Sequence, residues 1–154
     1  MKIGIISDTH SLLRPETIAA LDGVERILHM GDVGSMDVIT RLSQIAPVTA
    51  VRGNIDRDGL TSELPEAEVV EINGQFLYML HNLDELELSP EGAGFAAVLY
   101  GHTHKAKIHR HRGVLYFNPG SCGPRRFDLQ PSVGLLTLHS SGTLEATILP
   151  LLIR

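Results

Sequence analysis

Side chains that can bind metal ions recur at seven positions of the chain, and none of them is a cysteine. They are Asp8, His10, Asp32, Asn54, His81, His102 and His104. Oxygen and nitrogen donors without thiolates suit divalent ions such as Mn, Fe, Zn or Ni better than a cysteine-rich structural zinc site does. Seven donors are too many for one tetrahedral site, but two ions sharing one carboxylate would have about four protein ligands each. Two metal ions roughly 3.5–4 Å apart are typical of hydrolytic centres, so we expect a two-metal hydrolytic site.

Four of the eight histidines form two neighbouring His-x-His pairs. His102 and His104 directly follow the pattern of a buried strand, and we expect both to bind metal. His109 and His111 lie on the same face of a later expected strand as Lys107, with no carboxylate nearby in the sequence. We expect this second pair to lie at the surface, with a weak metal site as the alternative.

Five expected strands end close to these candidate ligands. The apolar or β-branched runs that predict the strands cover residues 2–7, 24–30, 47–53, 75–80 and 95–100. In open α/β sheets, ligands bind beyond the carboxyl ends of the strands. We therefore expect the seven side chains to converge at one edge of the fold.

The order of the expected elements indicates an α/β fold. Helices are expected at 14–23, where Pro15 suits the first turn, and at 35–47, where Ser35 can cap the helix. With the first three strands they give a β-α-β-α-β order, which favours a parallel sheet covered by helices.

The remainder of the chain is rich in expected strands. Asn73-Gly74 predicts a hairpin between two strands, and further strands meet at Gly113 and at Ser141-Gly142. The run between the hairpin and the strand at 95–100 is expected to be a short helix or a loop. We expect two sheets packed face to face, with helices outside, in one domain over residues 1–154.

Composition limits the classes of function. The 154 residues carry a formal net charge of −5, which argues against a non-specific binder of long nucleic acids, because such a binder needs a basic face. No apolar run approaches the roughly 20 residues of a membrane-spanning helix, and the amino terminus lacks the pattern of a signal peptide. The single Cys122 cannot form an internal disulfide. We expect a cytoplasmic protein with no membrane partner.

The candidate ligands belong to a longer series of motifs. In chain order the motifs are Asp8-x-His10, Gly31-Asp32, Gly53-Asn54-x-Asp56, His81, Gly101-His102-x-His104 and Asn118-Pro119-Gly120-Ser121. The series resembles that of the calcineurin-like metallophosphoesterases, and more narrowly of their small single-domain phosphodiesterases. The resemblance implies a four-layer αββα sandwich, in which two facing mixed β-sheets are flanked by helices.

The resemblance also implies how the ligands divide between the ions. Asp8, His10, Asp32 and His104 would bind one divalent ion, and Asp32, Asn54, His81 and His102 would bind the second. A hydroxide that bridges the ions would attack phosphorus in line, without a covalent phospho-enzyme. We expect Asp32, Asn54 and His81 to be needed for catalysis, and manganese ahead of iron, zinc or nickel as the metal.

These expectations describe a two-metal phosphoesterase whose partner is a small phosphoester, a diester more than a monoester. A protein-binding scaffold of the same fold, as in a retromer subunit, is the first alternative. A metal-dependent nuclease acting on long nucleic acid is the second, and the acidic net charge disfavours it. The acidic run 82–92 and the tail 148–154 are candidate contact surfaces in a homo-oligomer.

Two residues depart from the family pattern. Larger members often have a histidine after the metal-binding asparagine, where it helps to protonate the leaving oxygen, but this chain has Ile55. We therefore expect slow turnover of simple alkyl monoesters, and faster turnover of substrates with good leaving groups. Asn82 stands where the family usually has glycine; it could narrow the mouth of the site or orient substrate, or it could be a turn residue with positive φ.

Arginines near the motifs are candidates for binding the substrate phosphate. Arg125 and Arg126 follow the Asn118–Ser121 motif, and the forked guanidinium suits a phosphate, although both could instead be simple surface residues near Asp128. Arg52 and Arg14 also lie close to motif residues, and we rank them lower.

Four further residues have alternative interpretations. Asp56 could orient a ligand histidine or cap the following turn. His29 is expected to pack in or behind the site without binding metal. We expect His139 to be exposed at a strand end, and Cys122 to be a small buried packing residue.

Overall fold

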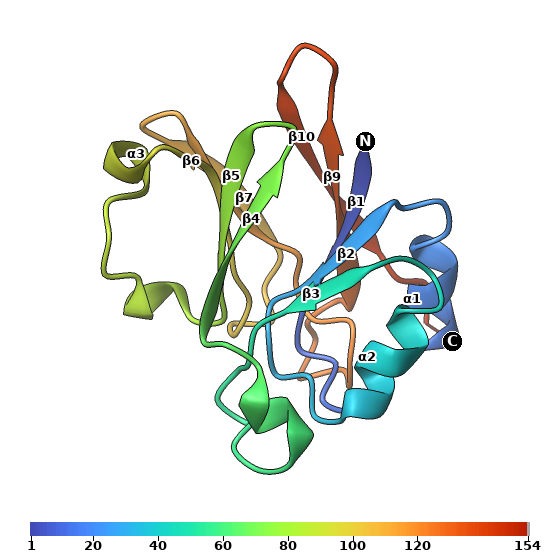
Figure 1. Ribbon diagram of the computed structural model, residues 1–154. Coiled ribbons are helices and arrows are strands. Elements are labelled where there is room, and N and C mark those ends of the chain that lie inside the picture. Colours follow the sequence, from blue (N-terminus) through green and yellow to red (C-terminus); the bar gives the residue numbers. More distant parts are fainter. Residues whose placement is uncertain (154) are drawn as a thin grey trace.

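Two five-stranded β-sheets pack face to face, and short helices lie on their outer sides (Figure 1). The structure is a computed structural model that describes residues 1–153, so the last residue of the predicted tail contact, Arg154, lies outside the described residues. Both sheets mix parallel and antiparallel pairs. The predicted α/β sandwich of two facing mixed sheets is confirmed.

The first sheet has the strand order β10-β9-β1-β2-β3. Its strands are β1 (Lys2–Ile6), β2 (Arg26–His29), β3 (Val48–Ala50), β9 (Ser132–Leu138) and β10 (Leu144–Pro150). β1, β2 and β3 are parallel, whereas β9 runs antiparallel to both β1 and β10. The carboxyl-terminal hairpin therefore completes a sheet that the first 50 residues begin.

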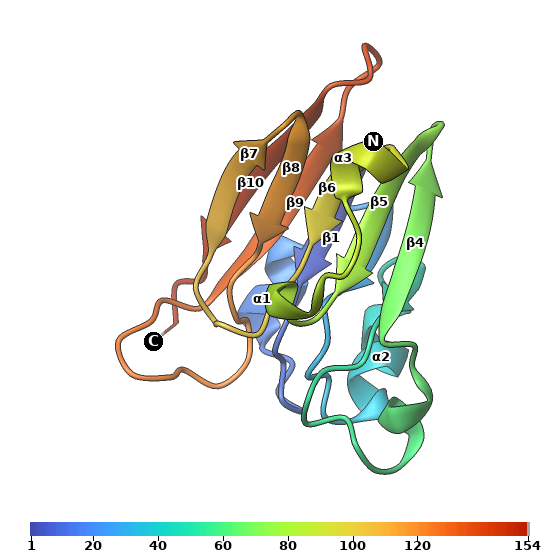
Figure 2. The same ribbon diagram turned by 90° about the vertical axis from the view of Figure 1, so that its left-hand side faces the viewer.

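The second sheet has the strand order β4-β5-β6-β8-β7. Its strands are β4 (Ala67–Ile72), β5 (Gln75–Leu80), β6 (Phe95–Leu99), β7 (Lys107–His111) and β8 (Val114–Asn118). β5, β6 and β8 are parallel, and β4 and β7 are antiparallel edge strands. Each sheet thus has three parallel strands, and Figure 2 shows β1, β5, β6 and β8 pointing toward the same end of the molecule.

The helices cover the two outer faces unequally. α1 (Pro15–Ala20) and α2 (Met36–Leu42) pack on the first sheet, and the Ser35 side chain caps α2 by accepting a hydrogen bond from the Asp37 N–H. On the second sheet the cover is thinner, with the 3₁₀ turn η2 (Leu83–Glu85) and α3 (Pro90–Ala93). A further 3₁₀ turn, η1 (Leu60–Glu63), follows β3. The segment before β6, which was predicted to be a short helix or a loop, contains the short helical turns η2 and α3 joined by a loop.

An aliphatic core fills the space between the sheets. Ile5 and Leu28 of the first sheet and Leu99 and Phe117 of the second are fully buried there. Burying such side chains stabilises the fold by about 1.5–3 kcal/mol each, and it sets the distance between the strand ends. None of the helices within residues 1–153 combines the length and apolar character that crossing a membrane requires.

Candidate metal centre

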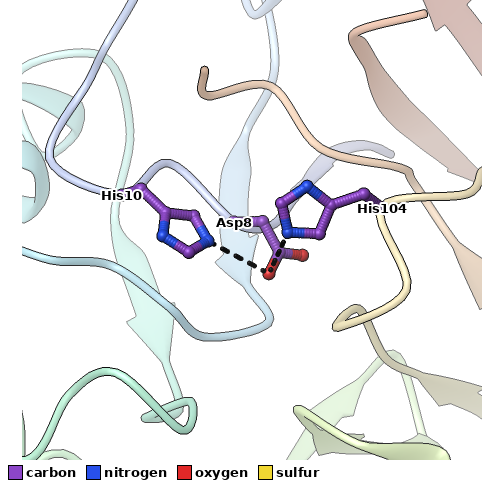
Figure 3. A group of neighbouring side chains, drawn as sticks. All are labelled: Asp8, His10 and His104. Carbon is purple, nitrogen blue, oxygen red and sulfur yellow. Dashed lines mark ion pairs between the residues drawn. The ribbon is translucent and has the colours of Figure 1, made fainter. Parts of the chain in front are cut away.

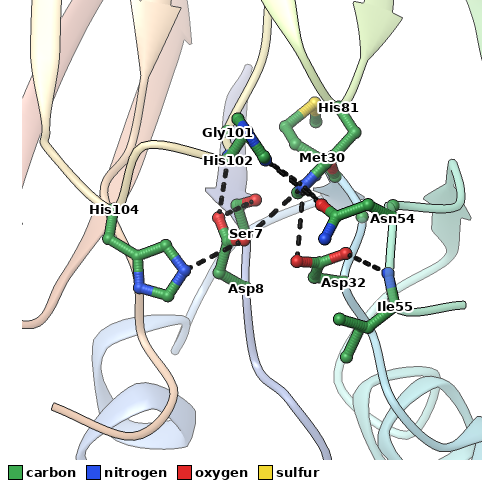
Figure 4. A network of polar contacts seen from close by, with 12 residues as sticks. Ser7, Asp8, Met30, Asp32, Asn54, Ile55, His81, Gly101, His102 and His104 are labelled. Carbon is green, nitrogen blue, oxygen red and sulfur yellow. Dashed lines mark hydrogen bonds and ion pairs between the residues drawn. The ribbon is translucent and has the colours of Figure 1, made fainter. Parts of the chain in front are cut away.

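All seven candidate ligands lie just beyond the carboxyl ends of parallel strands, at one end of the sandwich. Asp8 and His10 follow β1, Asp32 follows β2, and Asn54 follows β3. From the second sheet, His81 follows β5, and His102 and His104 follow β6. Because both sheets point their parallel strands the same way, side chains from both halves of the chain meet in one network (Figure 4).

Asp8 lies at the middle of the first group of ligand atoms. Its Oδ1 is 3.4 Å from His104 Nε2 and 3.8 Å from His10 Nε2 (Figure 3). Its Oδ2 accepts hydrogen bonds from the Ser7 hydroxyl at 2.6 Å and from the His102 N–H at 3.1 Å. The possible metal-ligand atoms of Asp8, His10 and His104 all lie within 4.8 Å of one another, a spacing that can hold a metal ion.

Asp32 lies between the first group and the second. Its Oδ2 is 3.4 Å from His10 Nε2 and also 3.4 Å from His81 Nε2, as a shared carboxylate requires. Its Oδ1 accepts a hydrogen bond from the Ile55 N–H, which fixes the rotation of the carboxylate. Asp8 Oδ1 is also only 3.8 Å from His81 Nε2, so both carboxylates reach both groups.

Asn54, His81 and His102 form the second group. His81 Nδ1 donates to the Met30 carbonyl oxygen at 2.7 Å, so a neutral His81 directs the lone pair of Nε2 into the site. That atom is 3.0 Å from Asn54 Oδ1 and 3.3 Å from His102 Nδ1, and His102 Nδ1 is 3.1 Å from the same Asn54 oxygen. One amide oxygen and two imidazole nitrogens therefore lie within 3.3 Å of one another, a set of atoms that can bind a cation.

Unpartnered buried atoms support a cation at this place. Asp8 Oδ1 and His10 Nε2 are buried without a hydrogen-bond partner among the described residues. A buried carboxylate oxygen without a partner is costly, and a bound metal ion removes that cost. Aspartate, asparagine and histidine are also ligands that Mn, Fe, Zn and Ni accept. The donor set and its orphaned atoms thus fit divalent metal ions.

The pKa shifts of the buried ligands also favour a bound cation. Burial alone would raise the pKa of Asp8, but the nearby imidazoles of His10, His104 and His81 outweigh it and lower that pKa well below its usual range. The pKa of Asp32 is also lowered, against the effect of burial, by the nearby His81 imidazole and by the hydrogen bond from the Ile55 N–H. Burial opposes protonation of His81, yet the two carboxylates raise its pKa. Two buried carboxylates therefore keep their charge and attract positive charge.

The backbone at these ligands adopts a rare conformation. Five of the seven have a left-handed backbone, with φ of 59° at Asp8, 46° at His10, 54° at Asp32, 75° at His102 and 63° at His104. Such conformations cost of order 1–3 kcal/mol each, persist only where surrounding contacts impose them, and cluster at functional sites. Gly101 lacks a Cβ where one would collide with the Ser7 hydroxyl, so the strand end can approach Asp8 closely.

Asp56 joins two of the ligand loops, a role the sequence did not indicate. Its side chain is 2% exposed and accepts hydrogen bonds from the N–H groups of Val33 at 3.1 Å, Gly34 at 2.9 Å and Gly53 at 2.8 Å. Neither alternative from the sequence describes this arrangement, because Asp56 contacts no histidine and ties the loop of Asp32 to the loop of Asn54. The carboxyl group thereby fixes the distance between two candidate ligands.

The Asn118–Ser121 motif also positions ligand loops. The Asn118 side chain donates to the Gly101 carbonyl and to the Thr103 hydroxyl, both at 3.1 Å. The Ser121 hydroxyl donates to the Asp8 carbonyl at 3.0 Å. The motif therefore holds the histidine loop after β6 and the aspartate loop after β1, a role that family resemblance flagged without specifying.

His29 lies behind the centre, as predicted, and does not reach the ligand atoms. Its Nδ1 accepts a hydrogen bond from the Gly31 N–H at 3.1 Å, so its Nε2 carries the proton and donates to the Thr9 hydroxyl at 3.0 Å. The ring is fully buried, and burial lowers its pKa to about 4. A neutral His29 thus braces the loops that carry Asp8 and Asp32.

The two departures from the family pattern have clear surroundings. Ile55 is 42% exposed beside Asn54, so this position offers no proton donor. Asn82 has φ of −112°, and its side chain accepts a hydrogen bond from the Asp84 N–H to start η2. The alternative of a positive-φ turn at Asn82 was wrong, because a cap requires an extended backbone. Asn82 also lines the mouth of the centre.

Arg125 and Arg126 are exposed on the loop after β8. They line a shallow depression that also includes His104, so they are near the centre but do not enclose it. Arg14 is used structurally, because its Nε donates to the Gly123 carbonyl. Phosphate binding by Arg125 and Arg126 stays a prediction.

Arg52 lies at the mouth of the candidate centre, although the sequence ranked it below Arg125 and Arg126 as a phosphate-binding candidate. It lines a hollow of about 150 Å³ together with Asn54, His81 and His102. Hydrogen bonds to the Ser62 carbonyl and an ion pair with Glu66 at 2.7 Å hold its guanidinium. An arginine held in place beside the candidate ligands is available to a phosphate oxygen there.

The remaining histidines and the cysteine lie away from the ligand atoms. His111 is exposed on the edge strand β7, and His109 stacks on Tyr116 with ring centroids 4.9 Å apart. His139 is exposed at a strand end, as predicted, and pairs with Glu145. Cys122 is fully buried, and burial raises its pKa to about 12, in agreement with a packing role.

Two facing mixed sheets with aspartates and histidines gathered at the ends of their parallel strands are the arrangement of a metallophosphoesterase. The chain belongs to the calcineurin-like phosphoesterase superfamily, whose domain profile matches residues 1–141. A probable metallophosphoesterase of Methanothermobacter thermautotrophicus is 36% identical over 97% of this chain and 92% of its own length. One from Methanocaldococcus jannaschii is 32% identical over 98% of this chain and 82% of its own length.

Solved structures with this fold include a phosphodiesterase and vacuolar protein sorting proteins. A structure described as a novel archaeal phosphodiesterase has a TM-score of 0.76 and 29% identity, over 97% of this chain and all of that one. Vacuolar protein sorting 29 of Cryptosporidium parvum has a TM-score of 0.75 and 21% identity, over 96% of this chain and 95% of that one. The second likeness concerns the fold alone.

Proposed function

We propose that this protein is a two-metal-dependent phosphodiesterase acting on a small phosphoester. Asp8, His10, Asp32 and His104 would bind one divalent ion, and Asp32, Asn54, His81 and His102 the second. Manganese is the first candidate, and iron, zinc and nickel are the others, because the set mixes carboxylate and amide oxygens with imidazoles. Bound ions would supply a nucleophile from water at neutral pH and neutralise charge on the phosphoryl oxygens.

One observation carries the proposal. Donor atoms from both sheets converge within a few ångströms, and a buried oxygen of Asp8 among them has no partner in the described part of the chain. A buried carboxylate oxygen without a partner is costly, and a bound cation would remove that cost. The shared position of Asp32, 3.4 Å from a histidine of each group, supports two ions rather than one.

The chain's own residues divide the remaining work. Asp56 and the Asn118–Ser121 motif hold the ligand loops at fixed distances, so little reorganisation accompanies binding. Arg52 and Asn82 at the mouth are placed to contact substrate oxygens. Because Ile55 cannot donate a proton, a leaving group that departs as a stable anion is favoured, and we propose diesters with such groups ahead of alkyl monoesters.

Metal analysis combined with a substrate panel tests the proposal. The purified protein is assayed for Mn, Fe, Zn and Ni, and then for hydrolysis of bis(p-nitrophenyl) phosphate, p-nitrophenyl phosphate and an alkyl monoester under each metal. We expect about two ions per chain and the highest kcat/KM with the diester. Asp32→Ala and His104→Ala should abolish turnover; undiminished turnover in either variant would overturn the mechanism.

A protein-binding scaffold is the second candidate, because a vacuolar protein sorting 29 with this fold, from Chaetomium thermophilum, has been solved in complex with a cyclic peptide. The two candidates make different demands on the centre. A scaffold would bind metal without turnover, so a fully loaded protein that hydrolyses nothing in the panel would favour this function. A phosphodiesterase loses activity when the metal is removed with a chelator and regains it when the metal is restored.

A further inference from the structure

Two further hollows adjoin the mouth of the candidate centre, and residues of the segment 83–88 line both of them. The lysine hollow, of about 310 Å³, shares Asn82 and His102 with the mouth. The glutamate hollow, of about 450 Å³, shares Glu66 and Glu85 with it. A substrate held at the centre could therefore extend into either hollow, and their chemistry decides which.

The lysine hollow is lined by hydrogen-bond donors. Lys105 and Lys107 both line it, and they are two of the only three lysines in the chain. The Asn82 side chain uses its oxygen to accept from the Asp84 N–H, which leaves its two N–H donors free. Thr103 accepts at its hydroxyl from Asn118 and from the Lys105 N–H, so its own proton is free to donate. Such a set suits a group rich in anionic oxygens.

Tyr100 adds a further hydrogen-bond donor to the lysine hollow. Its side chain is 5% exposed and lines the hollow. Within residues 1–153 its hydroxyl has no hydrogen-bond partner, so it is free to donate to a group in the hollow. A ligand oxygen in the hollow would provide the partner.

Charge separates the two hollows. The glutamate hollow is lined by Glu66, Glu85 and Glu87 and by no lysine or arginine, so it repels an anion, although Arg52 neutralises Glu66 in part. The lysine hollow carries a single carboxylate, Asp84, against its two lysines. An anionic part of the substrate is therefore drawn to the lysine side.

We propose that the lysine hollow binds a second phosphate group of the substrate while the ester to be cleaved lies at the metal centre. The inference rests on the proposed function and narrows it to phosphodiesters that carry an additional phosphomonoester. Lys105 and Lys107 neutralise that group, and Tyr100, Thr103 and Asn82 donate hydrogen bonds to it. These residues set specificity and take no part in the bond cleavage.

Two esters that differ only in the second phosphate test the proposal. Thymidine 5′-(p-nitrophenyl phosphate) and its 3′-phosphorylated form release the same p-nitrophenolate at the same centre. The ratio of kcat/KM for the phosphorylated over the plain ester is measured in the unaltered protein, in Lys105→Gln/Lys107→Gln, and in Lys2→Gln. Lys2 is the matched control, because it is the one lysine that does not line the hollow.

We expect a ratio above one that falls roughly tenfold in the double variant, through KM, and stays unchanged in Lys2→Gln. A separate Tyr100→Phe variant should also lower the ratio without unfolding the protein. Equal effects of the double variant on both esters would overturn the proposal, since the lysines would then act on the reacting phosphate. A ratio of one or less in the unaltered protein would overturn it as well.

A binding measurement separates this inference from the proposed function. Calorimetry compares thymidine 3′,5′-bisphosphate with thymidine 5′-phosphate, without any turnover. If neither ester is hydrolysed, the proposed function fails, but the bisphosphate should still bind more tightly and lose that advantage in the double variant. Equal binding of the two nucleotides to the unaltered protein would overturn the subsite itself.

Discussion

His102 and His109 each begin a His-x-His pair, yet their surroundings differ completely. His102 has a left-handed backbone, donates its N–H to Asp8, and places Nδ1 3.1 Å from the Asn54 oxygen. His109 lies on an edge strand and stacks on Tyr116. The same residue type at the same local spacing thus faces either the candidate centre or the outer surface of the second sheet.

The two histidines should therefore respond differently to substitution. His102→Ala should lower kcat/KM for a phosphodiester by more than the roughly 10–100-fold that loss of an outer partner of a metal ligand causes. His109→Ala should leave kcat/KM within about twofold, because its ring reaches no ligand atom. Parallel metal analysis shows whether activity and metal content fall together. Similar losses in both variants would contradict the assignment.

The backbone conformation of the candidate ligands is the feature of the site that the sequence predicted least. Their order and residue types could be predicted, since Asp8-x-His10 and Gly101-His102 are local patterns. The left-handed φ of Asp8, Asp32 and His104 could not, because it is imposed by contacts with segments distant in sequence. The same holds for Asp56, whose three N–H donors include two from a loop more than twenty residues away.

The neutral ring of His29 makes stability depend on pH. Burial lowers its pKa from 6.5 to about 4, so between these values the unfolded chain binds a proton that the folded protein does not. This contribution is fully present above about pH 6.5 and is lost as the pH falls toward 4. Between pH 7 and pH 5 it should lower the free energy of unfolding by about 2 kcal/mol.

Denaturant unfolding of the unaltered protein and of His29→Asn, at pH 7 and pH 5, checks this. The variant should be less stable at pH 7, because it loses packing, but its stability should fall less toward pH 5. Identical pH dependence in both proteins would mean that His29 does not titrate as its burial implies.

At the scale of elements, Asp56 connects the loops after β2 and β3. Asp56→Asn keeps the shape but turns one acceptor into a donor that faces backbone N–H groups. We expect a loss of about 1–3 kcal/mol in the free energy of unfolding and a 10–100-fold weaker metal affinity. Asp58→Asn is the matched control, because Asp58 is exposed two residues further along. Calorimetric metal titration of both variants gives the comparison, and equal affinities would contradict the role.

Elements with local signals were predicted well, and elements with long-range partners were not placed. The β4–β5 hairpin was predicted from its turn, with β5 at its observed bounds, because Asn73 and Gly74 both adopt the positive φ that a tight turn requires. The second helix ends at Leu42, earlier than predicted, where Ser43 donates its hydroxyl to the Ile39 carbonyl. Strand order could not be read, since β9 pairs with β1 over more than 130 residues.

For the whole molecule, the candidate centre lies where the two sheets meet. Asp8, His10, Asp32 and Asn54 follow strands of the first sheet, and the three other candidate ligands follow strands of the second. Bound ions would therefore link the sheets at one end of the sandwich. Binding to the folded state alone stabilises a protein by about 2.7 kcal/mol per site at a hundredfold excess over Kd.

Metal removal should therefore lower the melting temperature. For a chain of this length, 2.7 kcal/mol corresponds to roughly 5–10 °C for each ion removed. Thermal unfolding with manganese, and again after chelation and dialysis, measures the shift. Asp8→Asn should lose most of it, and His111→Ala, on the exposed edge of β7, should retain it. A melting temperature independent of metal would contradict a centre that joins the sheets.

The pairing of β1 with β9 also determines when the first sheet can be completed during synthesis. β1 is made first, but its antiparallel neighbour at Ser132–Leu138 emerges from the ribosome on the order of ten seconds later, at ordinary elongation rates. Throughout that interval one side of β1 presents unpaired backbone groups, a template for pairing with other chains. Asp8 and His10 directly follow this strand, so the candidate ligands of the first sheet are held by a pairing that forms late in synthesis.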